Sequence, residues 1–232
     1  MVVKEIFGRY LEETAFINST YDILKKYNFT SANSIASACL CRDELCQTAL
    51  VQIKNIWGEV FNFSSLGGLY TAGITGLKAF LSHAPDFNGA RRCVFYVFSH
   101  IGVDENGILG KCSRKGIIDS NACGALIFFL NELSKKTVSY SDVADEEQNY
   151  LKKRLLSEIN LSNLPNLLEL TKISLRATVK DIESLMQGFV KSDKIEYALI
   201  SGIQVHYLNR NYIIPEEFIV FEEAEIRKIE IL

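Results

Sequence analysis

The spacing of apolar and polar residues first predicts a helical arm at the start of the chain. Over residues 2–27, isolated apolar residues recur among charged neighbours at intervals typical of helices that pack on one face. Asn18 or Ser19 is a suitable N-cap for a second, short helix within this stretch. Residues 1–30 are therefore expected to form a helical arm ahead of the main fold.

A short apolar segment and an amphipathic helix follow the arm. Residues 34–40 (SIASACL) are small or apolar, which indicates a buried strand, although a run of this length also fits a buried helix. Asp43 and Glu44 then open a predicted helix, because acidic residues in a first turn interact favourably with the helix dipole. Its apolar residues recur at every fourth position: Leu45, Ala49, Ile53 and Trp57. Cys41 and Asp43 are thus expected at a strand-to-helix turn.

The same order of elements recurs further along the chain. A strand, a glycine turn and a helix are predicted at residues 60–63, 64–68 and 69–82. Residues 92–98 (RCVFYVF) are rich in β-branched and aromatic side chains and are apolar on both faces, as in a central parallel strand. We expect this strand to end at Ser99 and His100.

The second half of the chain begins with a predicted loop over residues 102–116, in which glycines recur. A helix with an N-cap at Ser120 or Asn121 follows, and it places Cys123 in its first turn. Two helices with a break near residues 160–165 come next. The remaining segments are predicted as a strand, a turn and a last short strand, at residues 197–207, 208–212 and 218–221.

Strands that alternate with helices predict an α/β fold with a mostly parallel sheet flanked by helices. The chain contains no repeat and no linker rich in proline or serine, so residues 1–232 are expected to form a single domain. Within it, residues 141–190 are expected to add extra helices in the C-terminal half.

Composition narrows the class of protein. With 232 residues, 48% of them hydrophobic, the chain can form a large core without a structural metal. The net charge of −3 is spread without a basic block, which argues against a nucleic-acid partner. No apolar run reaches the roughly 18–20 residues of a membrane span. Lys4 and Glu5 at the start do not resemble a secretory signal, so a cytoplasmic protein is expected.

The cysteines carry the candidate chemistry. Three of the six lie in residues 38–46 (ACLCRDELC), and in a reducing compartment they are expected as packed thiols, a reactive thiol or metal ligands. Cys41, His100 and Cys123 each fall where a predicted strand ends or a helix begins, at the sheet edge where ligands bind in such folds. Two thiolates and an imidazole suit Zn²⁺ and leave a fourth position for water.

Several longer motifs carry a family resemblance. They are CRDE (41–44), LGGLYTAGITGLKAFLSHAPD (66–86), SHIGVDENGILGKCSRKG (99–116), ACGAL (122–126) and SGIQVH (201–206). In this order, over roughly residues 30–210, the chain resembles the limiting-carbon-dioxide-inducible B family, a group of β-type carbonic anhydrases also called the theta class.

The resemblance implies a β-carbonic-anhydrase-like sheet, a homodimer, and zinc held by Cys41, His100 and Cys123. It implies reversible hydration of carbon dioxide to bicarbonate by zinc-bound hydroxide, which Asp43 would orient as a catalytic residue. Glycines in the second motif, Gly67 and Gly68 among them, would let the backbone approach the small substrate.

The chain departs from the wider β-carbonic-anhydrase pattern Cys-x-Asp-x-Arg, because Leu45 stands where the arginine that restrains the aspartate is usual. Arg42 is predicted to take this catalytic place, and Arg114 is the other candidate. A long glycine-rich insertion also replaces the usual His-x-x-Cys spacing. Without a restraining arginine, Asp43 would itself be able to bind zinc and close the site.

Two other functions remain open at this point. A cysteine hydrolase would use Cys41 as nucleophile and His100 as base. A non-catalytic zinc-binding relative would act in inorganic-carbon handling. His83 is retained as a candidate proton shuttle. The other candidate residues are expected to be structural: Cys39, Cys46, Cys93, Cys112, His206, Asp104 and Glu105.

Overall fold

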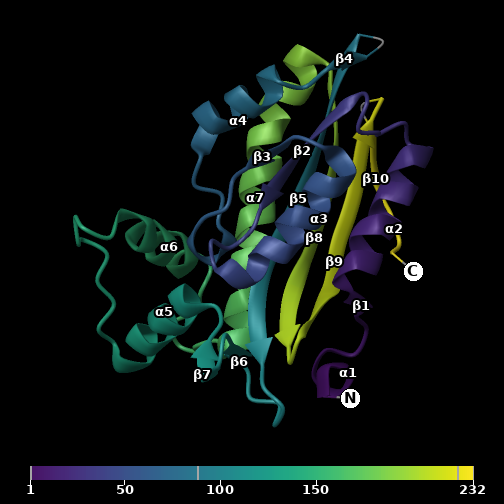
Figure 1. Ribbon diagram of the computed structural model, residues 1–232. Coiled ribbons are helices and arrows are strands. Elements are labelled where there is room, and N and C mark those ends of the chain that lie inside the picture. Colours follow the sequence, from purple (N-terminus) through teal and green to yellow (C-terminus); the bar gives the residue numbers. More distant parts are fainter. Residues whose placement is uncertain (1, 88, 224, 232) are drawn as a thin grey trace.

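The computed structural model describes residues 2–87, 89–223 and 225–231. Its centre is an eight-stranded sheet in the order β1-β9-β8-β5-β2-β3, with β10 paired to β9 and β4 to β5 (Figure 1). The strands are β1 (Leu11–Glu12), β2 (Ser34–Cys39), β3 (Val60–Asn62), β4 (Asp86–Phe87), β5 (Ala90–Val103), β8 (Ile195–Tyr207), β9 (Arg210–Glu222) and β10 (Glu225–Lys228). Parallel pairing joins β3, β2, β5 and β8, which confirms the predicted α/β class, whereas β9 pairs antiparallel with β8.

Helices cover both faces of this sheet. They are α1 (Val2–Phe7), α2 (Glu13–Lys26), α3 (Gln47–Trp57), α4 (Gly73–Ser82), α5 (Gly124–Lys135), α6 (Glu146–Leu156) and α7 (Leu167–Asp193). The long helix α7 runs along the sheet on the side opposite α2 and α3 (Figure 1). Among the described residues, none of these helices has both the length and the apolar character needed to cross a bilayer.

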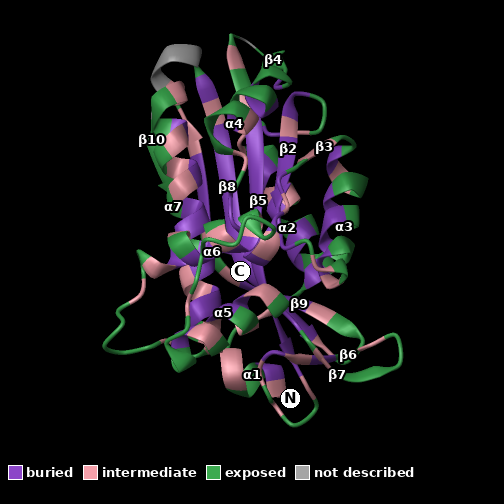
Figure 2. Ribbon diagram, turned by 90° about the vertical axis from the view of Figure 1, so that its left-hand side faces the viewer, coloured by how far each residue is buried: buried purple, intermediate pink, exposed green. Residues whose placement is uncertain are grey.

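Alternation along the strands divides the core into two clusters. Val94, Tyr96 and Phe98 of β5 pack toward α2 and α3, whereas Phe95 and Val97 pack toward α4 and α7. Successive side chains of a strand point to opposite faces, so a strand that is apolar throughout must be covered on both. Figure 2 shows the central strands buried along most of their length.

The amino-terminal arm differs from the prediction. A break separates α1 from α2 at residues 8–12, where Gly8 adopts a positive φ of 73° and β1 pairs with β9. Asn18 and Ser19 lie inside α2, and the Ser19 hydroxyl donates to the carbonyl of Ala15 instead of capping a helix. The pairing of β1 with β9 sets the boundary between α1 and α2, and the local sequence pattern gives no sign of that pairing.

The strand expected to end at His100 continues to Val103. Residues 99–103 pair in parallel with β8, with His100 opposite Gln204, and they are buried. The polar pair Ser99 and His100 therefore lies inside a strand, because tertiary pairing outweighs the local signal for a strand end.

The predicted glycine loop contains a hairpin of β6 (Lys111–Arg114) and β7 (Ile117–Asn121). Its turn is formed by Lys115 and Gly116, both with positive φ, as a tight hairpin turn requires. Ser120 and Asn121 consequently belong to β7 and cap no helix. Helix α5 begins at Gly124, and Cys123 occupies its N-cap position rather than its first turn.

The carboxyl-terminal half is close to the prediction up to β8. The break between the two helices is as expected, and α7 starts with a capping box of Asn166 and Glu169. In the amino-terminal half, the helix predicted to start at residue 69 begins only at Gly73, after the short 3-10 turn Leu66–Gly68. The strand predicted at residues 218–221 is longer, because β9 spans Arg210–Glu222, and a bulge opposite Ser201 and Gly202 accommodates Pro215. A further strand that was not predicted, β10, follows it.

Candidate metal centre

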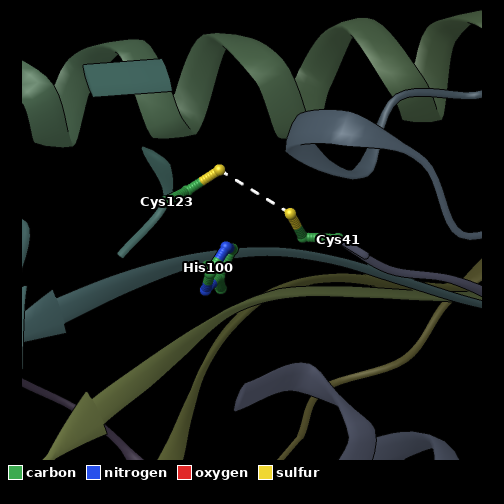
Figure 3. Close-up of side chains that lie close together, drawn as sticks. All are labelled: Cys41, His100 and Cys123. Carbon is green, nitrogen blue, oxygen red and sulfur yellow. Dashed lines mark hydrogen bonds between the residues drawn. The ribbon is translucent and has the colours of Figure 1, made fainter. Parts of the chain in front are cut away.

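Three chain segments bring Cys41, His100 and Cys123 together. Cys41 follows β2 and bridges to Ser65, His100 lies within β5, and Cys123 is the N-cap residue of α5. Their ligand atoms all lie within 4.8 Å of one another (Figure 3). The side chains are almost fully enclosed, with relative exposures of 3%, 1% and 2%. Residues far apart along the sequence thus converge just beyond the end of β2, although His100 itself lies inside β5 rather than at its end.

The donor set fits a tetrahedral zinc ion. The Sγ atoms of Cys41 and Cys123 are 3.7 Å apart. Two thiolates on one tetrahedral zinc, each at about 2.3 Å, lie roughly 3.8 Å from each other. The Nε2 atom of His100 is buried and has no hydrogen-bond partner, although nearly all buried polar atoms are paired. A cation between these three atoms would satisfy that nitrogen.

The two sulfur atoms share a proton unequally. Hydrogen bonding from Cys123 and from the backbone N–H of Asp43 holds the pKa of Cys41 well below its usual range despite burial. The hydrogen bond to Cys41, burial and the neighbouring negative sulfur raise the pKa of Cys123. The first thiolate therefore forms at Cys41, and a thiophilic cation would have to displace the proton of Cys123.

Asp43 is held by an arginine from the hairpin. Its carboxylate accepts hydrogen bonds from Nη1 and Nη2 of Arg114 at 2.9 and 3.3 Å, and its Oδ1 also caps the backbone N–H of Leu45. Arg114 donates to Glu44 as well, at 2.7 Å. Burial opposes the charge on Arg114, but these hydrogen bonds raise its pKa above the ordinary value. Asp43 joins neither group of possible metal ligands within the described residues.

Arg42, the arginine expected at Asp43, points elsewhere. Its side chain is 61% exposed and pairs with Glu147 at 3.3 Å, at the start of α6. Arg114 instead makes the ion pair that Leu45 cannot make. Sequence spacing could not single out Arg114, because β6 and its turn were expected as an irregular loop.

Gly67 and Gly68 pack beside Cys41, one of the three candidate ligands. Both have positive φ, and a Cβ on Gly68 would approach the carbonyl oxygen of Phe98 to 2.9 Å and the backbone nitrogen of Cys41 to 3.5 Å. Their carbonyl oxygens accept hydrogen bonds from Ser174 and Thr178 of α7. These contacts give the pair a packing role beside Cys41, and contact with a substrate stays a prediction.

A second group of donors adjoins the first. Cys46, His100 and His206 also have ligand atoms within 4.8 Å of one another, and His100 Nδ1 lies 3.1 Å from His206 Nε2. Burial lowers the pKa of His206 to about 3, so its ring is neutral. The sequence analysis predicted a structural role for His206. Its contact with His100 becomes visible only through the pairing of β8 with β5.

The remaining candidates lie outside both groups. Burial raises the pKa of the Cys39 thiol to about 12 and raises the pKa of Cys93 and Cys112, so these are unreactive buried thiols. His83 is exposed at the end of α4. A surface pocket of about 1050 Å³ lies over Tyr197 and Phe221 and contains none of the predicted ligands.

Comparison with known proteins agrees with this arrangement. Residues 10–222 match the model of a family described as limiting CO2-inducible proteins B/C, beta carbonic anhydrases. The crystal structure of limiting CO2-inducible protein LCIB superposes with a TM-score of 0.78 at 29% identity, over 97% of this chain and 96% of that one.

PtLCIB4, a homologue of LCIB, superposes with a TM-score of 0.77 at 19% identity, over 98% of both chains. A variant of PtLCIB4 gives 0.82 at 20% identity, over 99% of this chain and 96% of that one. These two likenesses show the fold alone. A search of curated proteins gives no significant match. Because the family match spans nearly the whole chain, this protein belongs to the limiting CO2-inducible protein B/C family of β carbonic anhydrases.

Proposed function

We propose that this protein hydrates carbon dioxide reversibly to bicarbonate at a zinc ion held by Cys41, His100 and Cys123. The observation that carries the proposal is the convergence of two cysteine sulfurs on the unpartnered Nε2 of a buried histidine. Three protein ligands leave one tetrahedral position for water, which distinguishes a catalytic zinc site from a closed structural one.

Zinc bound in this position would supply a Lewis acid that lowers the pKa of water to about 7, so hydroxide is available at neutral pH. Asp43 supports the reaction as a hydrogen-bond acceptor beside the site, two residues beyond the Cys41 ligand. Its carboxylate remains an acceptor because Arg114 donates to both of its oxygens. Arg114 also keeps Asp43 from taking the fourth ligand position, which preserves the place for water.

The surroundings of the ligands suit an apolar substrate. Cys41 and Cys123 belong to the same buried cluster as Leu126, Leu69 and Phe98. A small uncharged molecule such as carbon dioxide loses little hydration on entering such a site, whereas an ion would lose much. We extend the proposal to a homodimer, to be tested by sedimentation of the purified chain, and to a cytoplasmic location, to be tested by cell fractionation.

Metal analysis and stopped-flow hydration of the same samples test the proposal. Cys41→Ser, His100→Ala and Cys123→Ser should each lower zinc below about half of the wild-type content and abolish hydration. Asp43→Ala should keep the metal and lose rate. Cys93→Ser, a buried cysteine of β5 remote from the cluster, is the matched control and should keep both. Full zinc occupancy without hydration would reject the enzymatic function.

Two observations keep other functions in view. The lowered pKa of Cys41 beside His100 also suits a cysteine nucleophile with a histidine base, as in a hydrolase. That function requires activity without zinc and its loss on alkylation. Leu45 in the usual arginine position suits a zinc-binding relative without catalysis, which full occupancy with no hydration would indicate.

A further inference from the structure

We propose that His206, Asn211 and Thr48 are positioning residues that hold His100 in the tautomer with a proton on Nδ1 and a free lone pair on Nε2. The inference rests on the proposed function, because it assigns these residues to the metal ligand of that site. It follows from a chain of hydrogen bonds that links the Leu45 carbonyl to His100. At each bond, knowing which atom accepts fixes which atom must carry the proton.

The chain starts at an atom whose role is fixed. The carbonyl oxygen of Leu45 can only accept, and the Thr48 hydroxyl lies 3.4 Å from it. When this hydroxyl donates, its oxygen is available to accept from Nδ2 of Asn211, at 2.7 Å. The amide of Asn211 is thereby oriented with its Oδ1 toward His206.

The two histidines complete the chain. Oδ1 of Asn211 lies 2.9 Å from Nδ1 of His206, and a carbonyl oxygen requires this nitrogen to carry the proton. A neutral His206 then has a lone pair on Nε2, which accepts from Nδ1 of His100 at 3.1 Å. The other nitrogen of His100, Nε2, is left without a proton and faces the two sulfur atoms (Figure 3).

A buried carboxylate gives the same orientation independently. Glu13 of α2 is 2% exposed, and the amide groups of Gln52 and Gln204 donate to it. Burial raises the pKa of Glu13, and hydrogen bonds from Gln204 and Asn211 oppose this rise. In its ionised form the Glu13 carboxyl accepts only, so the NH₂ group of Asn211 faces Glu13 and Thr48 and its oxygen faces His206.

Strand pairing makes this arrangement rigid. In the parallel pair β5–β8, His206 lies opposite Gly102, two residues beyond His100, and in the hairpin β8–β9 it lies directly opposite Asn211. Metal-ligating histidines commonly donate their second nitrogen to a fixed acceptor, and loss of that acceptor weakens metal binding about 10–100-fold. Here a neutral histidine, rather than a carboxylate or backbone carbonyl, is the acceptor.

The same contact has a rival explanation. A cation bound by Cys46, His206 and Nδ1 of His100 would need the opposite tautomer, with the proton of His100 on Nε2. One His100 tautomer therefore serves the cluster of Cys41 and Cys123, and the other serves the cluster of Cys46. The position of a single proton distinguishes the two.

Nitrogen-15 NMR of histidine-labelled protein measures that position directly. The chain has three histidines, so His83→Gln and His206→Phe suffice to assign the signals. We expect Nδ1 of His100 to carry the proton and Nε2 to lack one in the metal-free wild type at alkaline pH, and Nδ1 to stay protonated with zinc. A proton on Nε2 of His100 in the metal-free protein overturns the inference.

Zinc affinity, measured by competition with a chromogenic chelator, is the second readout. His206→Phe and Asn211→Leu should weaken zinc binding about 10–100-fold. The matched control is Ser201→Ala, which removes a buried hydroxyl of β8 that bonds to Glu217 and does not reach the site. Losses no greater than in this control, or a second zinc that requires Cys46, contradict the inference.

The outcomes separate this inference from the proposed function. Wild-type protein that binds zinc and hydrates carbon dioxide, with His100 in the wrong tautomer, rejects the positioning role alone. Protein that binds no zinc, with His100 in the expected tautomer, rejects the metal site and leaves the hydrogen-bond chain confirmed. In the His83 variant both remaining histidines are expected to carry their proton on Nδ1, so the measurement remains decisive without separate assignment if the core variants do not fold.

Discussion

Replacing Arg114 by methionine removes the only described group that fixes both carboxylate oxygens of Asp43. Methionine keeps much of the length of the side chain but neither donates a hydrogen bond nor carries charge. The Arg114 and Asp43 side chains are only 13% and 12% exposed. Exposed ion pairs contribute about 0.2–1 kcal/mol, whereas removing one partner of a buried pair costs about 3–5 kcal/mol. We therefore expect Arg114→Met to lower the free energy of unfolding by about 2 kcal/mol.

The effect on hydration should exceed the effect of instability. Without Arg114, Asp43 is free to turn toward the metal or to lose its orientation, so kcat should fall at least about tenfold, equivalent to about 1.4 kcal/mol. Zinc content should stay unchanged, because none of the three ligands is altered. Stopped-flow hydration and metal analysis on one preparation, with urea unfolding in parallel, measure all three quantities.

A matched ion pair in the central sheet separates the two effects. Arg92 pairs with Glu196 at 2.7 Å, with side-chain exposures of 11% and 16%, far from the metal centre. Arg92→Met should cost similar stability and leave the rate intact. Arg42→Met tests the sequence-based candidate; with its exposed side chain it should cost less than about 1 kcal/mol.

Leu45→Arg in the Arg114→Met background places an arginine where related enzymes carry one, and it should restore part of the rate. An Arg114→Met protein that hydrates carbon dioxide at the wild-type rate would refute the assignment of Arg114 to Asp43. A large rate loss in Arg42→Met would favour the sequence-based candidate instead.

Three further predictions concern packing, titration and the metal. Gly68→Ala should lower the free energy of unfolding by about 1–3 kcal/mol, because its positive φ and the close carbonyl of Phe98 exclude a methyl group; Gly188→Ala, where a Cβ meets nothing within 4 Å, should instead stabilise α7 in the same urea assay. Burial and nearby Glu217 raise the pKa of Glu183 above 4.5, so the folded state loses stability as pH rises through that pKa. Glu183→Gln should therefore increase stability at pH 7, by less than about 1 kcal/mol, and lose that advantage near pH 4, as unfolding at both pH values will show. Zinc at a hundredfold excess over its dissociation constant should stabilise the protein by about 2.7 kcal/mol, seen as a higher melting temperature that a chelator reverses and that His100→Ala lacks.

The local pattern of the sequence was sufficient for the central parallel strands, and it placed the three candidate ligands where predicted strands end or helices begin; the family resemblance singled them out as a set. The apolar segments that became β2, β5 and β8 are buried on both faces, and such segments remain recognisable without knowledge of their neighbours. The carboxyl edge of parallel strands gathers residues from separate segments, so Cys41, His100 and Cys123 could be expected to meet. Their meeting is a property of topology, which the order of strands and helices encodes.

The groups that surround these ligands were decided only by tertiary structure. Arg114 reaches Asp43 because residues 111–121 fold back as a hairpin over the strand-to-helix turn. His206 reaches His100, and Asn211 reaches His206, through the register of β8 with β5 and β9. This contact exists because β5 continues past Ser99 and His100, where the sequence predicted its end. Periodicity along one segment reports which face is buried, but a hydrogen bond between strands depends on register, and a shift of one residue would turn each side chain to the other face.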